Sequence, residues 1–158
     1  MQYGREEDDP PLVLGHTDMW TNNILFERRK EGGLELLAFV DWQCATVGLA
    51  LLDVASVVGI NMSAVERRRT EETILSRYTN RMRERKKEFV REFDVTFDSV
   101  RRLYLRCLRF AALQLCLTVG GLLTAPVGDS EEVKEKRRRH AEQLKHSAER
   151  LKGILEDI

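Results

Sequence analysis

The amino-acid sequence predicts an α+β protein that is mainly α-helical, with a β-hairpin near its start and a helical region after it. Before about residue 60, short apolar runs alternate with Gly, Asn and Asp, which is typical of strands joined by tight loops. After that point apolar residues recur three to four positions apart, as on amphipathic helices. The 158 residues suit one domain, and 42% hydrophobic residues are enough for a sizeable core.

A hairpin and a buried helix are expected in the first 60 residues. Residues 23–27 (NILFE) and 34–42 (LELLAFVDW) have the composition of strands, and the RRKEGG segment between them supplies two glycines for the turn. Residues 50–60 are too densely apolar for a surface helix, so we expect a short helix there, buried under the hairpin.

Three longer helices are expected after residue 60, and the first two are described here. The second should start at a cap supplied by Thr96 or Asp98, cover more than one face with apolar residues and therefore form the core. Gly120, Gly121 and Pro126 should end it. The helix before it is predicted from the spacing of Ile74, Leu75, Tyr78, Met82, Phe89 and Phe93.

The last helix should begin at a cap supplied by Asp129 or Ser130, with acidic residues at the positive end of its dipole. His140 and His146 are six residues apart on different faces and lack partners at metal-site spacing, so we expect them to be exposed. The apolar seam of this helix is predicted to consist of Val133, Leu144, Leu151, Leu155 and Ile158.

Charge and cysteine usage limit the partners. With 26 basic and 26 acidic residues the formal net charge is zero. The basic clusters ERRRTEE, RMRERKK and EKRRRH are interleaved with glutamates and lack aromatic partners, which favours solvated helix faces over nucleic-acid binding. No stretch approaches the roughly 18 apolar residues of a membrane span. Cys44, Cys107 and Cys116 form no CxxC pair, and two of them lie in apolar helical sequence. We therefore expect reduced, buried thiols in a cytoplasmic protein without a membrane partner.

Polar residues crowd into VLGHTDMWTNNILF, residues 13–26, and LLAFVDWQ ends an apolar run at Asp41. An Asx turn would explain Asp18 and Asn23 alone. Phosphoryl transfer from a magnesium-bound nucleotide needs a carboxylate that accepts the proton of the attacking hydroxyl and oxygen ligands that hold the metal. Asp18, Asn23 and Asp41 meet this requirement. The short gap between Asn23 and Asp41 predicts that the loop meets the end of the second strand.

HTDMWTNNILF, AFVDWQ and GLALLDVASVV together resemble the choline kinase-like and aminoglycoside phosphotransferase-like families, most closely the CHK kinase-like group. The family pattern is His-Gly-Asp, four residues, Asn, and then a strand that ends in Asp. The resemblance covers residues 11–158 and implies a protein-kinase-like C-lobe after an acidic segment, residues 1–10. Its implied parts are a catalytic loop and hairpin at 11–45, a buried helix at about 50–60 and a helical subdomain at about 63–158.

The resemblance also implies roles for single residues. By position, Asp18 is the catalytic base, Asn23 and Asp41 bind magnesium, and Asp53 braces the loop from behind as a structural residue. His16 steadies the loop, with an ordinary hydrogen-bonded loop histidine as the alternative. The implied cofactors are ATP and Mg2+, and the implied acceptor is a hydroxyl of a small molecule. Its identity, any protein partner and the oligomeric state are not specified by the sequence.

Two departures from the family pattern stand out. Thr17 occupies the position of the family glycine, where a β-branched residue is unwelcome if the backbone is unusual. No glycine-rich loop and no Val-Ala-Ile-Lys-like strand precede residue 11, so we expect the N-lobe to be missing and the chain to be a kinase fragment with weak or absent activity. Trp20 and Trp42 are expected in the core rather than against substrate.

Two other functions remain as alternatives to a small-molecule kinase. The first is a catalytically inactive pseudokinase or helical interaction module, in which residues 60–158 form a docking surface. The second is a protein kinase, which is disfavoured because HTD and DWQ differ from the His-Arg-Asp and Asp-Phe-Gly of that class and no Ala-Pro-Glu segment follows.

Overall fold

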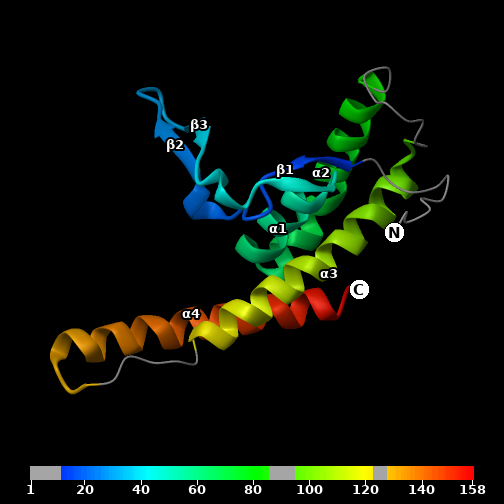
Figure 1. Cartoon of the computed structure of the whole chain (residues 1–158). Coiled ribbons are helices and arrows are strands. Elements are labelled where there is room, and N and C mark those ends of the chain that lie inside the picture. Colours follow the sequence, from blue (N-terminus) through cyan, green and yellow to red (C-terminus); the bar gives the residue numbers. More distant parts are fainter. Residues whose placement is uncertain (1–11, 86–94, 123–127) are drawn as a thin grey trace.

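The computed structural model describes residues 12–85, 95–122 and 128–158, and in these ranges the protein is α+β and mostly helical, as predicted. Figure 1 shows a helical body from which one hairpin projects. The strands are β1 (Leu12–Gly15), β2 (Ile24–Arg28), β3 (Leu34–Phe39) and β4 (Thr46–Leu49). The helices are α1 (Leu52–Asn61), α2 (Ala64–Glu84), α3 (Phe97–Leu122) and α4 (Glu131–Leu155). Single 3₁₀ turns occur at Thr21–Asn23 and Trp42–Cys44.

The described strands form two antiparallel pairs. The predicted hairpin is β2–β3, with Ile24 opposite Phe39 and a register shift after Leu25. Its turn contains Gly32 and Gly33 at φ values of 90° and 88°, a backbone region that glycine enters without strain. The second pair, β1–β4, was not predicted, because each strand is four residues long and the two are far apart in sequence.

The apolar helix predicted at 50–60 is α1. It packs mainly against α3, whereas the prediction that it lies under the hairpin was wrong. The close approach depends on Gly59, because a Cβ atom there would lie 3.0 Å from the Cβ of Ala111. The hairpin instead projects away from α1 in Figure 1, and most of its side chains are exposed.

The core lies along α3, as predicted. Its N-terminus is capped by Thr96, whose Oγ1 accepts a hydrogen bond of 3.1 Å from the Ser99 amide. The helix ends at Leu122, one residue after the predicted stop at Gly120 and Gly121. Pro126, Phe89 and Phe93 lie outside the described residues. The buried hydrophobic residues of α3 are Val100, Leu103, Tyr104, Cys107, Leu108, Ala111, Ala112 and Leu115.

The last helix, α4, begins at Ser130, whose side chain accepts from the Val133 amide as one of the two predicted caps. The predicted seam is wrong at its end, since Leu155 is 58% exposed and Ile158 39% exposed. Leu155 is the last residue of α4 and Ile158 lies beyond the helix, so neither continues the packed face. The residues on that face are Leu144, Ser147, Leu151 and Ile154.

Several surface expectations can be compared with the structure. Cys107 is buried as expected, but Cys44 and Cys116 are exposed, and all three are free thiols. Cys116 directly follows the buried Leu115 and is exposed, as is the next residue, Leu117. Glu135 pairs with Arg138 and Arg139 on the outer face of α4, as on a solvated helix. Among the described helices, none combines the length and apolar character that a membrane crossing requires.

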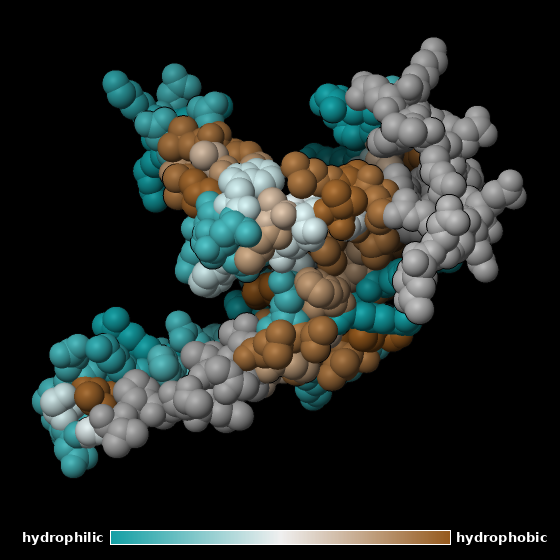
Figure 2. Space-filling model, viewed as in Figure 1, coloured by the Kyte–Doolittle hydropathy of each residue, from teal (hydrophilic) through white to brown (hydrophobic). Residues whose placement is uncertain are grey.

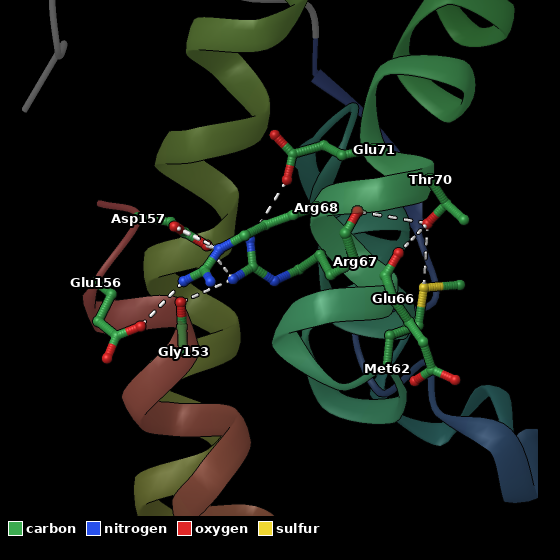
Figure 3. Close-up of polar contacts among 9 residues, drawn as sticks. All are labelled: Met62, Glu66, Arg67, Arg68, Thr70, Glu71, Gly153, Glu156 and Asp157. Carbon is green, nitrogen blue, oxygen red and sulfur yellow. Dashed lines mark hydrogen bonds and ion pairs between the residues drawn. The ribbon is translucent and has the colours of Figure 1, made fainter.

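A buried arginine joins α2 to the end of α4 (Figure 3). The Arg67 side chain is 1% exposed, and its Nη2 donates to the Gly153 carbonyl over 2.8 Å and to the Asp157 carboxylate. Its Nη1 lies 3.3 Å from a carboxylate oxygen of Glu71. The neighbouring Arg68 also donates to Asp157 but is 46% exposed. A desolvated charge of this kind is stable only while its partners remain.

The Arg67→Ala variant is therefore expected to lose about 3 kcal/mol of unfolding free energy, because it leaves acidic groups and a carbonyl without their buried partner. Arg68→Ala is the matched control and should cost less than about 1 kcal/mol, as expected for a half-exposed pair. Urea unfolding followed by circular dichroism measures both values. Equal losses would contradict the assigned difference in burial.

Asp157 predicts an acid dependence of stability. Burial raises the pKa of Asp157, but hydrogen bonds from Arg68 and Arg67 outweigh it and hold the pKa below the ordinary 3.8. Because the folded-state pKa is lowered, this contribution is present above about pH 4 and is lost as the pH falls through the folded-state pKa. Urea unfolding between about pH 5 and 3 should show a steeper loss in the natural chain than in Asp157→Asn. Parallel curves would exclude this assignment.

Candidate active site

The loop after β1 is fixed by Asp53, which lies in the first turn of α1. The His16 amide donates to Asp53 Oδ2 over 2.7 Å, and the Thr17 amide donates to Oδ1 over 2.8 Å. Gly15 leaves room for this contact, since a Cβ atom there would lie 3.3 Å from Oδ2. Hydrogen bonds to a carboxylate are stronger than neutral ones, so Asp53 holds the loop at two successive residues. If Asp53 braces the loop, as the sequence predicted, these two hydrogen bonds are the contacts through which it would do so.

Thr17 adopts the left-handed backbone conformation, with φ of 60°. A β-branched side chain is disfavoured there by roughly 1–2 kcal/mol, which explains why glycine suits this position. Three contacts offset the strain in this chain. Besides the bond to Asp53, Thr17 Oγ1 donates to the Cys44 carbonyl, and the Thr17 carbonyl accepts from Gln114 Nε2 over 3.3 Å.

His16 connects this loop to the end of β3. Its side chain is buried, and Nε2 lies 2.7 Å from the Val40 carbonyl oxygen, to which the Nε2–H tautomer donates. The Val40 amide in turn donates to the Asn23 carbonyl over 3.0 Å. The loop that contains His16 and Asn23 therefore meets the end of β3, as the spacing of Asn23 and Asp41 predicted. The imidazole also lies against the Trp42 ring, with centroids 4.8 Å apart.

Asn23 contacts Asp18 directly. Asn23 is buried, and its Nδ2 donates to the Asp18 carbonyl over 2.8 Å and reaches Asp18 Oδ2 at 3.5 Å. These bonds use the amide hydrogens and direct Asn23 Oδ1 away from them, where it is an acceptor. The structure thus brings together the predicted base and one predicted metal ligand.

Asp41 lies at the turn after β3 and is exposed, with φ of 62°. Its Oδ2 accepts a weak hydrogen bond of 3.4 Å from Gln43 Nε2. Carboxylate and amide oxygens are the ligands that magnesium prefers, so the residue types of Asp41 and Asn23 fit this metal. In the described ranges no group of three or more His, Cys, Asp or Glu side chains is placed to hold a metal. A magnesium ion here would accordingly need phosphate or water oxygens as further ligands.

A cleft of about 690 Å³ opens beside Asp18. One wall is the loop with Trp20, Thr21 and Asn22, and the other consists of residues from α1, α3 and α4. Its volume falls within the usual range of small-molecule sites. The lining residues on the helical side are Ile60, Asn61, Gln114, Leu115, Gln143, His146, Ser147 and Arg150.

The two tryptophans are not in the core, so that expectation was wrong. Trp20 is 40% exposed and Trp42 is 48% exposed. They lie in the turns before β2 and after β3, and Trp42 Nε1 donates to the Phe39 carbonyl over 2.9 Å. Trp20 lines the cleft, which places it within reach of a bound molecule.

Several residues of the site were not found from the sequence. Asn61 Oδ1 accepts from the Thr21 amide at 3.2 Å and from its hydroxyl, tying the far end of the loop to α1. Gln114 bonds Thr17 across 97 positions of sequence. No local pattern marks such contacts, because amide side chains on helices are common and their partners are set only by the fold.

Fold and site together define an α+β domain whose loops present two carboxylates and an amide beside a helical body. The chain belongs to the DUF1679 family, described as "Uncharacterized oxidoreductase dhs-27", whose model matches residues 11–158. A protein of Caenorhabditis elegans with that same name is 27% identical over 126 residues, which are 77% of this chain and 15% of that protein. The chain therefore spans about 15% of the length of this curated relative. No solved structure matches the chain.

Removing the Asp53 carboxylate should release the loop. In Asp53→Asn one acceptor oxygen becomes an amide donor that opposes a backbone N–H, so we expect a loss of about 2 kcal/mol in unfolding free energy. The amide NMR signals of His16 and Thr17 should move upfield as their hydrogen bonds weaken. Asp129→Asn, at an exposed position before α4, is the control and should change neither quantity. Unchanged His16 and Thr17 signals in Asp53→Asn would contradict the bracing role.

Proposed function

We propose that this chain is the C-lobe of a CHK kinase-like phosphotransferase, which transfers the γ-phosphate of ATP to a hydroxyl of a small molecule. The observation that carries the proposal is the pair of hydrogen bonds from Asn23 Nδ2 to Asp18, next to the backbone bond that joins Asn23 to the end of β3. A loop carboxylate, a buried amide and a carboxylate after the next strand then lie in the order that the family pattern requires.

In the proposed reaction Asp18 orients the acceptor hydroxyl and takes its proton. The hydroxyl oxygen forms a bond to the γ-phosphorus, the bond to the β–γ bridging oxygen breaks, and ADP leaves with that electron pair. Asn23 fixes the Asp18 loop through its two hydrogen bonds, so the carboxylate needs little reorientation. Asp18 lines the cleft, where an acceptor can reach it.

Magnesium would be held by Asn23 Oδ1 and the Asp41 carboxylate together with phosphate oxygens. When bound, the ion neutralises charge on the phosphates and keeps them aligned. His16 and Asp53 act as positioning residues: His16 bonds Val40, beside Asp41, and Asp53 bonds the loop that precedes Asp18. Neither touches a reacting group in this assignment.

An exposed apolar surface on the β2–β3 hairpin supports the proposal that an ATP-covering lobe packs there. Figure 2 shows hydrophobic residues over the hairpin, with hydrophilic residues at its tip. A soluble protein rarely exposes so many large apolar side chains in one place unless something covers them. In the proposed kinase, the N-lobe of a longer protein would pack here. The exposed apolar residues of the hairpin are Leu25, Phe26, Leu34, Leu36, Leu37 and Phe39.

The name of the nematode relative refers to an oxidoreductase, and this chain matches 15% of that protein. Dinucleotide-binding domains are built on parallel sheets, whereas the described strands here pair antiparallel. We therefore propose phosphotransfer, rather than hydride transfer, as the reaction of this chain. An inactive pseudokinase remains the alternative, and it is separated from the active kinase by the following experiment.

The test uses a protein in which this domain is joined to an ATP-covering lobe, incubated with Mg2+, ATP and a panel of alcohols. We expect phosphorylated product, and Asp18→Asn should reduce kcat by about a hundredfold or more, since the general base is lost. The control Asp129→Asn should keep the full rate. Product formation that survives Asp18→Asn would overturn the role of Asp18, and the absence of product and of any ATP-dependent rise in Tm would favour the pseudokinase.

A further inference from the structure

The helical wall of the cleft carries positive charge opposite the loop. His146 and Arg150 are one turn apart on α4 and both line the cleft, while Asp18 lies on the other side. Among the described residues that line it, Asp18 is the sole carboxylate and Trp20 the sole aromatic residue other than histidine. A site for a cationic acceptor would need more acidic or aromatic groups than this.

Arg150 is half-buried and forms no ion pair with any described carboxylate. Its charge does act on Glu66, whose pKa is lowered first by hydrogen bonds from Ser63 and also by Arg150. Glu66 is already engaged, because it accepts from the Ser63 amide over 3.0 Å and from its hydroxyl over 2.7 Å. The guanidinium therefore retains donors for a ligand, and a planar fork of donors matches a carboxylate well.

The remaining lining is neutral. Asn61, Gln114 and Gln143 contribute amide groups, and Ile60 and Leu115 contribute apolar surface. Such a lining suits a molecule that is partly apolar and carries polar substituents at its ends.

We propose that this cleft binds an acceptor that carries a carboxylate as well as the hydroxyl, with Arg150 holding the carboxylate and Asp18 facing the hydroxyl. This assignment of the acceptor rests on the proposed phosphotransfer function, which does not itself specify the charge of the acceptor. A hydroxy acid is thus selected over a neutral alcohol or an amino alcohol by an arginine and a carboxylate that line the same cleft.

The test measures binding and does not depend on catalysis. Three probes of the same shape are titrated into the 158-residue chain by NMR: 4-(hydroxymethyl)benzoate, 4-(hydroxymethyl)benzamide and 4-(hydroxymethyl)benzylamine. We expect the benzoate to bind about tenfold more tightly than the benzamide, because a charge-assisted bidentate pair replaces neutral hydrogen bonds, and the benzylamine to bind weakest. The signals that shift should include those of Arg150, Gln143 and Thr21.

Variants assign the effect to one side chain. Arg150→Gln should abolish the preference for the benzoate, Arg150→Lys should keep part of it, and Lys145→Gln, an exposed charge on the same helix, should keep all of it. Equal binding of the three probes, a preference for the benzylamine, no detectable binding, or displacement of the benzoate by Mg-ATP at Arg150 would each overturn the proposal. Selective benzoate binding without Asp18-dependent phosphotransfer would overturn only the proposed function.

Discussion

The carboxylate of Asp53 is the constraint on which the candidate site depends. Asp53 lies at the start of α1, and α1 is fixed because Gly59 lets it approach α3 closely. The two hydrogen bonds from Asp53 to the loop transmit this position to His16 and Thr17, and through them to Asp18. The helical core thus determines where the loop lies. A loop held only by its own turn would sample many backbone states, and a general base on it would lose orientation.

Thr17 shows how a β-branched residue is accommodated in a left-handed backbone conformation. The loop keeps a positive φ at this residue although glycine is absent. Strain of this kind persists only when the surroundings fix the conformation more than once. Here the amide, the hydroxyl and the carbonyl of one residue are each bonded to a different segment of the chain, namely α1, the turn before β4 and α3. The left-handed conformation is therefore enforced by tertiary contacts that a glycine would not need.

Local patterns in the sequence were sufficient for some elements and not for others. The hairpin and α1 were predictable because their signals lie within short stretches of sequence. The β1–β4 pair was not predictable, since its register joins Leu12 to Leu49 and depends on where α1 begins. Trp20 and Trp42 were misplaced because aromatic residues beside apolar runs are usually core residues, whereas these lie on a projecting part of the fold. The cleft combines residues from the loop and three helices, so no single segment of the sequence predicts it.

The two halves of α4 have different surroundings, and the cleft lies beside the second half. In the first half, glutamates and arginines pair along an exposed face, as in Glu135 with Arg138. The second half packs Ser147 and Ile154 inward, and Arg67 ties its last turn to α2 through Gly153 and Asp157. His146 and Arg150 lie in this anchored half. A cationic side chain selects a ligand best when the helix that carries it is fixed relative to the opposite wall of the cleft. If the side chain had to be ordered on binding, the loss of entropy would weaken the affinity. The buried Arg67 contacts and the Asp53 bonds thus serve the same end, since one fixes the helical wall and the other fixes the loop that faces it.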